Sequence, residues 1–177
     1  DIDNVVLARR QELNGGWVET RYVYDANNRR IVTVHPEGNR TFQTFDDLGR
    51  PKATYTGVEP STGLDDDGYA DSPTATFLVE TSSDFNPNGT VSASTDGRNN
   101  DATYFYDWAN RLIATRDPLG NGVRRTLDVA GNVITTEAGV IDTSGAITNV
   151  LSRSYARYDE LGRVYRTVRD GDISNDE

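Results

Sequence analysis

The sequence has 177 residues and a formal net charge of -10, from 18 Lys and Arg against 28 Asp and Glu, and its hydrophobic content is 35%. The acidic balance argues against nucleic-acid binding, because neutralising phosphates requires a basic stripe. It also argues against a basic amphipathic helix on a membrane surface, and no apolar run suggests membrane insertion in this segment. Cysteine is absent, so disulfides and thiolate metal sites are excluded and sheet packing must stabilise the fold.

Short strands separated by tight turns are the predicted elements. Residues 5–13 are compatible with a first strand before a turn at residues 14–16. Residues 17–24 are rich in aromatic and β-branched side chains, which is typical of a strand, and residues 30–34 form its return strand. Residues 35–39 are the next turn. The pattern predicts an all-β fold, an antiparallel meander of β-hairpins with strands of about five residues and two alternating types of turn.

The chain also repeats itself. Residues 22–50 align without a gap to residues 104–132, 82 positions later, and thirteen of the twenty-nine positions are identical. A smaller unit occurs within each copy: an apolar residue, Asp, two variable residues, Gly or Asn, and usually Arg. It is found five times, and its residues include Tyr24, Asp25, Asn28 and Arg29; Asp46, Gly49 and Arg50; Tyr106, Asp107, Asn110 and Arg111; Asp128 and Gly131; and Tyr158, Asp159, Gly162 and Arg163. Successive units within a copy are 21 residues apart.

This unit has the composition of a tight turn. Gly and Asn tolerate a left-handed backbone at the least cost, and an Asp three residues earlier can accept backbone N–H groups across the turn. The unit therefore predicts a hairpin turn with a bulge at the Gly or Asn.

The recurring Tyr-Asp-x-x-Gly-Arg unit, together with Asp117-Pro118-Leu119-Gly120-Asn121, resembles the YD repeat of the Rhs family over nearly the whole chain. In Rhs-like, toxin-complex and teneurin proteins such sheets spiral into a large hollow shell, which in the bacterial toxins encloses a C-terminal polypeptide. The resemblance implies that this chain is an internal repeat fragment and forms part of a curled sheet or spiral β-shell. Two departures from the family pattern stand out: Asn132 replaces the Arg, and the unit expected between Gly57 and Tyr104 is eroded.

Five segments follow from the repeats. Residues 1–57 hold YD repeats, a partial one and then two full turns; residues 58–75 are an acidic loop insertion; residues 76–103 are a degenerate repeat; residues 104–170 are YD repeats with a hairpin extension near residues 140–150; and residues 171–177 are an acidic tail. The extension is predicted to have a Ser-Gly tip. The opening residues 3–6 resemble the end of a repeat turn, so we expect the sequence to begin inside the array.

Calcium is the one metal for which the spacing of hard oxygen ligands offers a hypothesis. The candidate ligands are Asp65, Asp67 and Asp71 in the acidic insertion and, separately, Asp84, Asn86 and Asn88. Neither set has Glu at the twelfth position of a calcium loop, since Thr76 and Thr95 stand there. A solvated acidic loop is the favoured alternative, and no other cofactor is expected.

Catalysis is not expected. The only histidine, His35, occupies a turn position that Asp117 holds in the second copy, so a nucleophile activated by a His base is disfavoured. The repeated aspartates already have a role in capping turns, which leaves little support for a pair of glycosidase carboxylates. Asp117-Pro118-Leu119-Gly120 resembles an element of self-cleaving Rhs regions, but a near copy at residues 35–39 also fits an ordinary turn, so we expect no self-cleavage.

The sequence thus predicts a structural, non-enzymatic repeat segment of a secreted or cell-surface YD/Rhs-repeat protein, acting as shell wall or scaffold. Its partners would be the rest of the parent chain or further copies of itself. Two alternatives stay open. One is an extracellular adhesion module, with or without calcium, whose acidic insertion binds a glycan or a cell-surface protein. The other is a subunit of an extracellular fibre, because open ends of a sheet can stack without closing.

Overall fold

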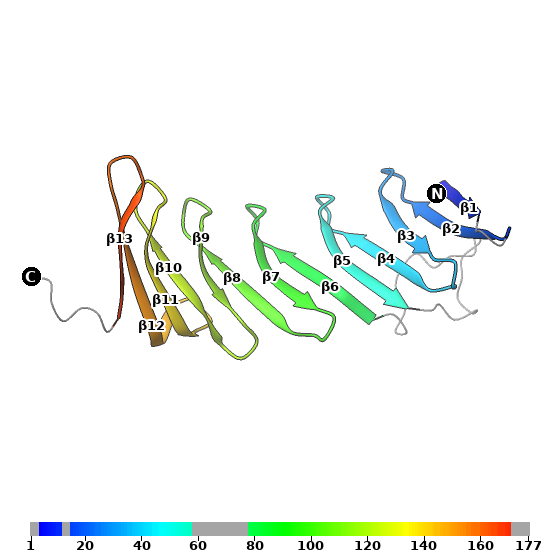
Figure 1. The fold of residues 1–177 in the computed structure, drawn as a ribbon. Coiled ribbons are helices and arrows are strands. Elements are labelled where there is room, and N and C mark those ends of the chain that lie inside the picture. Colours follow the sequence, from blue (N-terminus) through cyan, green and yellow to red (C-terminus); the bar gives the residue numbers. More distant parts are fainter. Residues whose placement is uncertain (1–3, 12–14, 58–77, 171–177) are drawn as a thin grey trace, which may run out of the picture. The chain divides into compact units, whose positions relative to one another are not determined.

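A computed structural model describes residues 4–11, 15–57 and 78–170, and in these residues the protein is all β with no helix. Hydrogen bonds join thirteen strands side by side in chain order, as Figure 1 shows by colour. The strands are β1 (Asn4–Gln11), β2 (Trp17–Tyr24), β3 (Arg30–Val34), β4 (Arg40–Phe45), β5 (Pro51–Gly57), β6 (Leu78–Phe85), β7 (Val91–Asp96), β8 (Asp101–Tyr106), β9 (Leu112–Arg116), β10 (Asn121–Leu127), β11 (Val133–Ile141), β12 (Ile147–Tyr158) and β13 (Val164–Arg169). The predicted antiparallel meander is confirmed. Among the described residues the strand order begins at β1 and ends at β13.

The strands predicted in the first repeat have the bounds that the side-chain pattern indicated, since β2 and β3 span residues 17–24 and 30–34. The segment in which a hairpin extension was predicted contains β11 and β12, the longest strands in the described part of the chain, with 9 and 12 residues, and Ser144-Gly145 lies at their turn. The eroded segment still forms strands, namely β6, β7 and the start of β8. The acidic insertion and the acidic tail lie outside the described residues.

The chain divides into two compact units. The first consists of residues up to Ser83 together with Thr95–Asn99, and the second of Asp84–Ser94 together with the residues from Asn100 onward.

The core of the first unit is one row of side chains across neighbouring strands. Val23, Val32 and Phe42 are 1%, 1% and 2% exposed, and they are successive Cα partners from β2 to β4. Tyr55 on β5 continues the row opposite Phe42 and packs against the cluster. This alternation of buried and less buried residues is expected of a sheet with one better-covered face.

Close backbone packing takes the place of large side chains in part of the second unit. Gly122 on β10 and Gly139 on β11 are Cα partners. A Cβ atom would lie 1.8 Å from the Thr115 carbonyl oxygen at Gly122, and 1.9 Å from the Asn149 carbonyl oxygen at Gly139. Only glycine fits at these two positions. The buried side chains of this unit include Ala114 and Ile141.

Such a thin core places much of the stability in the hydrogen bonds of the sheet and its turns. No buried polar or charged residue occurs in the described ranges. These same ranges hold no helix long and apolar enough to cross a membrane.

Candidate functional site

The repeated turns are the candidate site, and nine of them share one backbone geometry. In each, the N–H of the first residue donates to the carbonyl of the fifth, and the N–H of the fourth donates to the carbonyl of the first. The fourth residue always has a positive φ, between 60° and 94°, which Gly and Asn adopt most readily. These turns begin at Asp25, His35, Asp46, Asn86, Asp107, Asp117, Asp128, Asp142 and Asp159. The two turn types expected from the sequence therefore differ in their side chains and not in their backbone.

A shift in the register of strand pairing accompanies each of the five repeat units, and it lies on the return strand, not at the Gly or Asn where a bulge was predicted. The register of strand pairing shifts at the residue before the Asp in all of them, at Tyr24, Phe45, Tyr106, Leu127 and Tyr158. The extra residue lies on the return strand three positions after the Gly or Asn, as Ile31 does after Asn28, and a bulge there increases the local twist of the strands.

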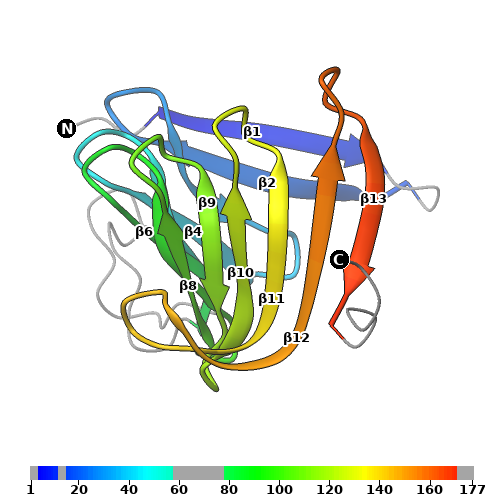
Figure 2. The same ribbon diagram turned by 90° about the vertical axis from the view of Figure 1, so that its left-hand side faces the viewer.

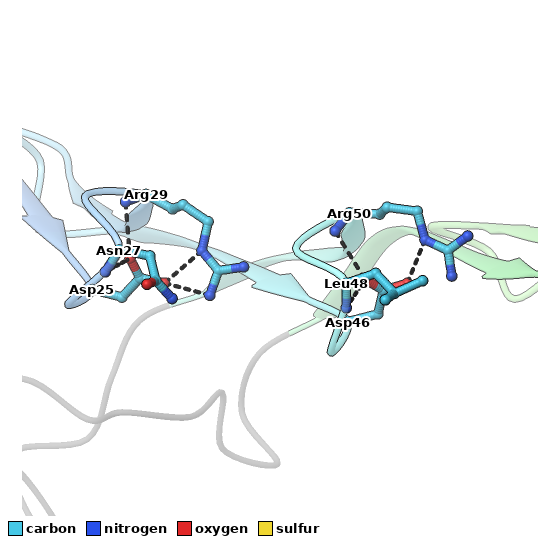
Figure 3. Close-up of polar contacts among 6 residues, drawn as sticks. All are labelled: Asp25, Asn27, Arg29, Asp46, Leu48 and Arg50. Atoms are coloured by element: carbon cyan, nitrogen blue, oxygen red, sulfur yellow. Dashed lines mark hydrogen bonds and ion pairs between the residues drawn. The ribbon is translucent and has the colours of Figure 1, made fainter. Parts of the chain in front are cut away.

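The Asp of the unit uses both carboxylate oxygens within its own turn. In Asp25, Oδ1 accepts the N–H of Asn27 at 3.0 Å and of Arg29 at 2.9 Å, and Oδ2 accepts Nε of Arg29 at 2.7 Å. Figure 3 shows this arrangement and its equivalent at Asp46 and Arg50. The same contacts recur at Asp107 with Arg111 and at Asp159 with Arg163. Each turn is thus closed by a charge-assisted pair.

Asn132 preserves the capping role at the point where the sequence departs from the family pattern. Its backbone N–H donates to Oδ1 of Asp128 at 2.8 Å, and its Nδ2 donates to Oδ2 at 2.9 Å. The turn at residues 128–132 therefore keeps its geometry without an ion pair.

These contacts keep the aspartates ionised. In Asp25, partial burial raises the pKa, but the hydrogen bonds and charge of Arg29 outweigh it and the net pKa is lowered. The backbone hydrogen bond from Arg111 is the main cause of the lowered pKa of Asp107, and the side-chain hydrogen bond from Asn132 is the main cause at Asp128. The pKa is lowered in the same way at Asp46, Asp142 and Asp159. Because their pKa values are lowered, these carboxyl groups are ionised near neutral pH and have no proton to donate. Their role is therefore to cap the turns.

The arginine of one repeat unit also contacts the turn of the next repeat unit. The sequence did not reveal these contacts. The guanidinium carbon of Arg29 lies 4.4 Å from the ring centroid of Phe45, and its Nη1 would be 3.2 Å from a Cβ at Gly49. In the second unit, Nη1 of Arg111 donates to the Asp128 carbonyl at 3.1 Å. The arginine therefore links turns that lie 21 residues apart, and the repeat period is the only sequence signal for it.

Two further aspartates cap turns outside the five repeat units. Asp142 follows the apolar Ile141 and precedes Gly145 by three residues, but no Arg completes its unit, and Asp96 follows Thr95. Asp142 Oδ1 accepts the N–H groups of Ser144 and Ala146 at 2.8 Å and 3.0 Å. Asp96 Oδ1 accepts the N–H of Arg98 at 2.9 Å, and its carbonyl accepts the N–H of Asn99. An Asp three residues before Gly or Asn would have identified both.

His35 and Asp117 both lie at turns, as the sequence predicted. The His35 ring is hydrogen-bonded to the Thr41 hydroxyl, with 3.0 Å between Nε2 and Oγ1. Asp117 Oδ1 accepts the N–H groups of Leu119 and Asn121 at 2.9 Å and 2.8 Å. Both positions thus have a structural role in the sheet.

Of the calcium candidates, Asp65, Asp67 and Asp71 lie outside the described residues. Asp84 belongs to β6, and Asn86 begins a turn in which its Nδ2 donates to the Thr90 hydroxyl at 2.9 Å. The Oδ1 atom of Asn88 accepts the Thr90 hydroxyl at 2.8 Å and backbone N–H at 3.2 Å. No group of three or more His, Cys, Asp or Glu residues placed to hold a metal occurs in the part of the chain that the structure describes. Calcium binding stays a prediction.

No family model and no curated protein matches the chain. Solved structures are similar to it: the crystal structures of TcdB2-TccC3-Cdc42, of TcdB2-TccC3, and of TcdB2-TccC3 without its hypervariable C-terminal region. Their TM-scores are 0.58, 0.57 and 0.57, and their sequence identities are 19%, 19% and 20%. Each comparison covers 84% of this chain and 7% of the other. At this identity the likeness shows the fold: an antiparallel hairpin sheet of the same kind forms a small part of much longer chains.

Proposed function

We propose that the chain is a structural, non-enzymatic segment of a secreted or cell-surface YD/Rhs-repeat protein, in which it forms part of a shell wall or scaffold. The observation that carries this proposal is the open strand order, with β1 and β13 at its two ends. A sheet with unpaired edges invites further strands, as an internal section of a longer repeat array requires.

The use of the charged side chains supports the same role. The repeated aspartates are hydrogen-bonded within their turns, and Arg29 and Arg111 link their own turns to the following ones. The groups that recur through the chain thus serve the connection of hairpin to hairpin, and the architecture is that of a repeat protein stabilised by contacts between neighbours.

The structural neighbours add support for a wall segment. A match to 7% of the TcdB2-TccC3 chains is the relation expected of one section of a large repeat protein. Together with the Tyr-Asp-x-x-Gly-Arg units, it favours a toxin-complex type of shell over a stand-alone domain.

Electron cryomicroscopy of the natural protein that contains this segment tests the proposal. We expect β1 and β13 to pair with strands of flanking repeats and one face of the sheet to border an interior space. A closed, separate domain with both edge strands unpaired in that protein would contradict the wall function. Protease treatment of intact cells, with detection of the segment by antibody, tests its exposure at the cell surface.

A further inference from the structure

Three pairs of neighbouring strands are incompletely paired at the end opposite the turn that joins them. The strand pairs β3–β4, β9–β10 and β11–β12 are each joined by a turn at one end. Toward the other end, the pairing of residues stops before the first residue of β3, β9 or β11 is reached. The last paired residues there are Val32, Ala114 and Thr135, and in each case two further residues of the same strand have no partner in that pair. Figure 2 shows β11 and β12 diverging in this way.

In two of these gaps, an arginine of the chain crosses to the next turn. Arg29 immediately precedes β3 and contacts Phe45 at the end of β4. Arg111 immediately precedes β9 and donates to the Asp128 carbonyl just after β10. Each guanidinium also stays bound to its own turn, with Nη2 at 2.6 Å from Asp25 Oδ2 or Asp107 Oδ2.

The third gap differs because Asn132 precedes β11. The Asn132 side chain ends in an amide that is hydrogen-bonded to Asp128. No guanidinium therefore extends from this position toward the next turn. A groove of about 640 Å³ lies at this place, lined among others by Asp128, Ile134, Ala156 and Tyr158. Tyr158 stands in the sequence position of Phe45, the ring over which Arg29 lies, and its hydroxyl donates to the Val133 carbonyl at 3.0 Å.

We propose that this groove binds an arginine side chain supplied by a partner polypeptide. We choose arginine as the bound side chain because a guanidinium occupies the two equivalent gaps. There it is held by a carboxylate of one turn and by an aromatic ring or a carbonyl of the next. Asp128 is an ionised carboxylate in the groove, and Tyr158 is an aromatic ring suited to a cation.

The charges that line the groove also restrict which residues can stand next to the arginine in the partner polypeptide. Arg157 and Arg166 line the groove and are Cα partners on β12 and β13. Their positive charge disfavours a purely basic peptide, so the partner segment carries an acidic residue next to its arginine. This inference rests on the gaps and their side chains and does not depend on the proposed function.

Nuclear magnetic resonance titration of the 177-residue chain tests the site with the peptide acetyl-Ala-Arg-Asp-Ala-amide. We expect amide shifts centred on Ile134 and Ala156, and binding weakened by at least about tenfold when citrulline, the neutral isostere, replaces the arginine. Equal binding of the citrulline peptide, or shifts confined to other strands, would falsify the proposal.

Substitution at the gap supplies the matched test. Asn132→Arg should fill the groove from within and abolish peptide binding, while raising the melting temperature by completing the link to the next turn. Asn121→Arg places the same side chain at the fifth position of a turn that does not line the groove, and should leave binding intact. Unchanged peptide binding by a folded Asn132→Arg protein would also overturn the inference, and the titration of the unsubstituted chain decides the matter if that variant does not fold.

Discussion

At the scale of single residues, the Tyr-Asp-x-x-Gly-Arg unit divides its work between two side chains. The Asp closes its own turn through three hydrogen bonds, as at Asp25. The Arg joins that turn to the one 21 residues later, as Arg29 does at Phe45. The two roles are separable, because Asn132 performs the first without the second.

This division predicts unequal effects of removing different arginines. Arg29→Gln should destabilise the protein by about 1–2 kcal/mol, lowering the melting temperature by roughly 2–8 °C for a chain of this size, because a charged pair and a cation–π contact are lost together. Arg163→Gln is the matched control. The Arg163 side chain is 73% exposed, against 31% for Arg29, so its loss should lower the melting temperature less. Equal effects in thermal unfolding would show that the contact with the next turn contributes nothing.

The capping aspartates also predict acid sensitivity. Their pKa values in the folded protein lie below those of the unfolded chain, about 3.9, so their contribution to stability is complete above that value. It is lost as pH falls through the folded pKa values. We therefore expect the melting temperature to be level from pH 7 to about 5 and to fall steeply below about 4.

Asp46→Asn identifies the source of this acid sensitivity. The substitution removes the ion pair with Arg50 and should lower the melting temperature at pH 7. The difference from the unsubstituted protein should shrink as the pH falls through the lowered pKa of Asp46, because Asp46 itself then becomes protonated. A difference that stays constant over this range would assign the acid sensitivity to other groups.

At the scale of elements, close approach of backbones fixes the arrangement of β9 to β12. Gly122→Ala should destabilise the protein by more than about 3 kcal/mol, since the Cβ would lie 1.8 Å from the Thr115 carbonyl oxygen and backbone would have to move. Gly38→Ala is the control: its φ is 88°, but a Cβ there meets nothing within 4 Å. That change should cost only the strain of a left-handed alanine, about 1–2 kcal/mol. Denaturant unfolding of both variants checks the order, and a milder effect at Gly122 would contradict this packing.

Much of the element scale could be predicted from the sequence, since the turn chemistry is local. A Gly or Asn marks each of the nine turns, with Asp three positions earlier in most of them and His35 or Asn86 in the other two, and the strands between the turns follow. The links made by Arg29 and Arg111 could not be predicted, because they depend on which turns become neighbours across the sheet. The pairing of Gly122 with Gly139 escaped for the same reason: both glycines look ordinary until the register brings β9 and β12 against them.

At the scale of the whole molecule, the two end strands of the strand order are the places where association is expected. Exposed apolar side chains lie on both end strands, with Val6 50% and Val164 54% exposed. We expect the 177-residue chain to self-associate as its concentration rises, through pairing of edge strands. Size-exclusion chromatography with light scattering measures this. Val6→Lys with Val164→Lys should restore a monomer, whereas Leu48→Lys, at a turn residue that is 74% exposed, should not. Large ordered assemblies would favour the fibre alternative, and a monomer at all concentrations would contradict association through these edges.

Calcium dependence is the second prediction at this scale. If the acidic insertion or the Asp84 to Asn88 segment binds calcium in the folded state, calcium should raise the melting temperature relative to EDTA. A hundredfold excess over the dissociation constant would stabilise the fold by about 2.7 kcal/mol. Replacing Asp65, Asp67 and Asp71 by Asn should remove the effect if the insertion holds the ion. Identical melting temperatures in calcium and EDTA would exclude a stabilising site.

In the five repeat units, the turn hydrogen bonds described above use the backbone N–H of the third residue and no side chain of the second or third residue. Those side chains point outward, with Trp108 94%, Val129 104% and Leu161 77% exposed, while the Asp before them and the Gly or Asn after them maintain the backbone. The tips can therefore change in evolution almost independently of the fold, as the hypervariable loops of a recognition scaffold do. A protein engineer could graft foreign epitopes at these positions, one in each repeat unit.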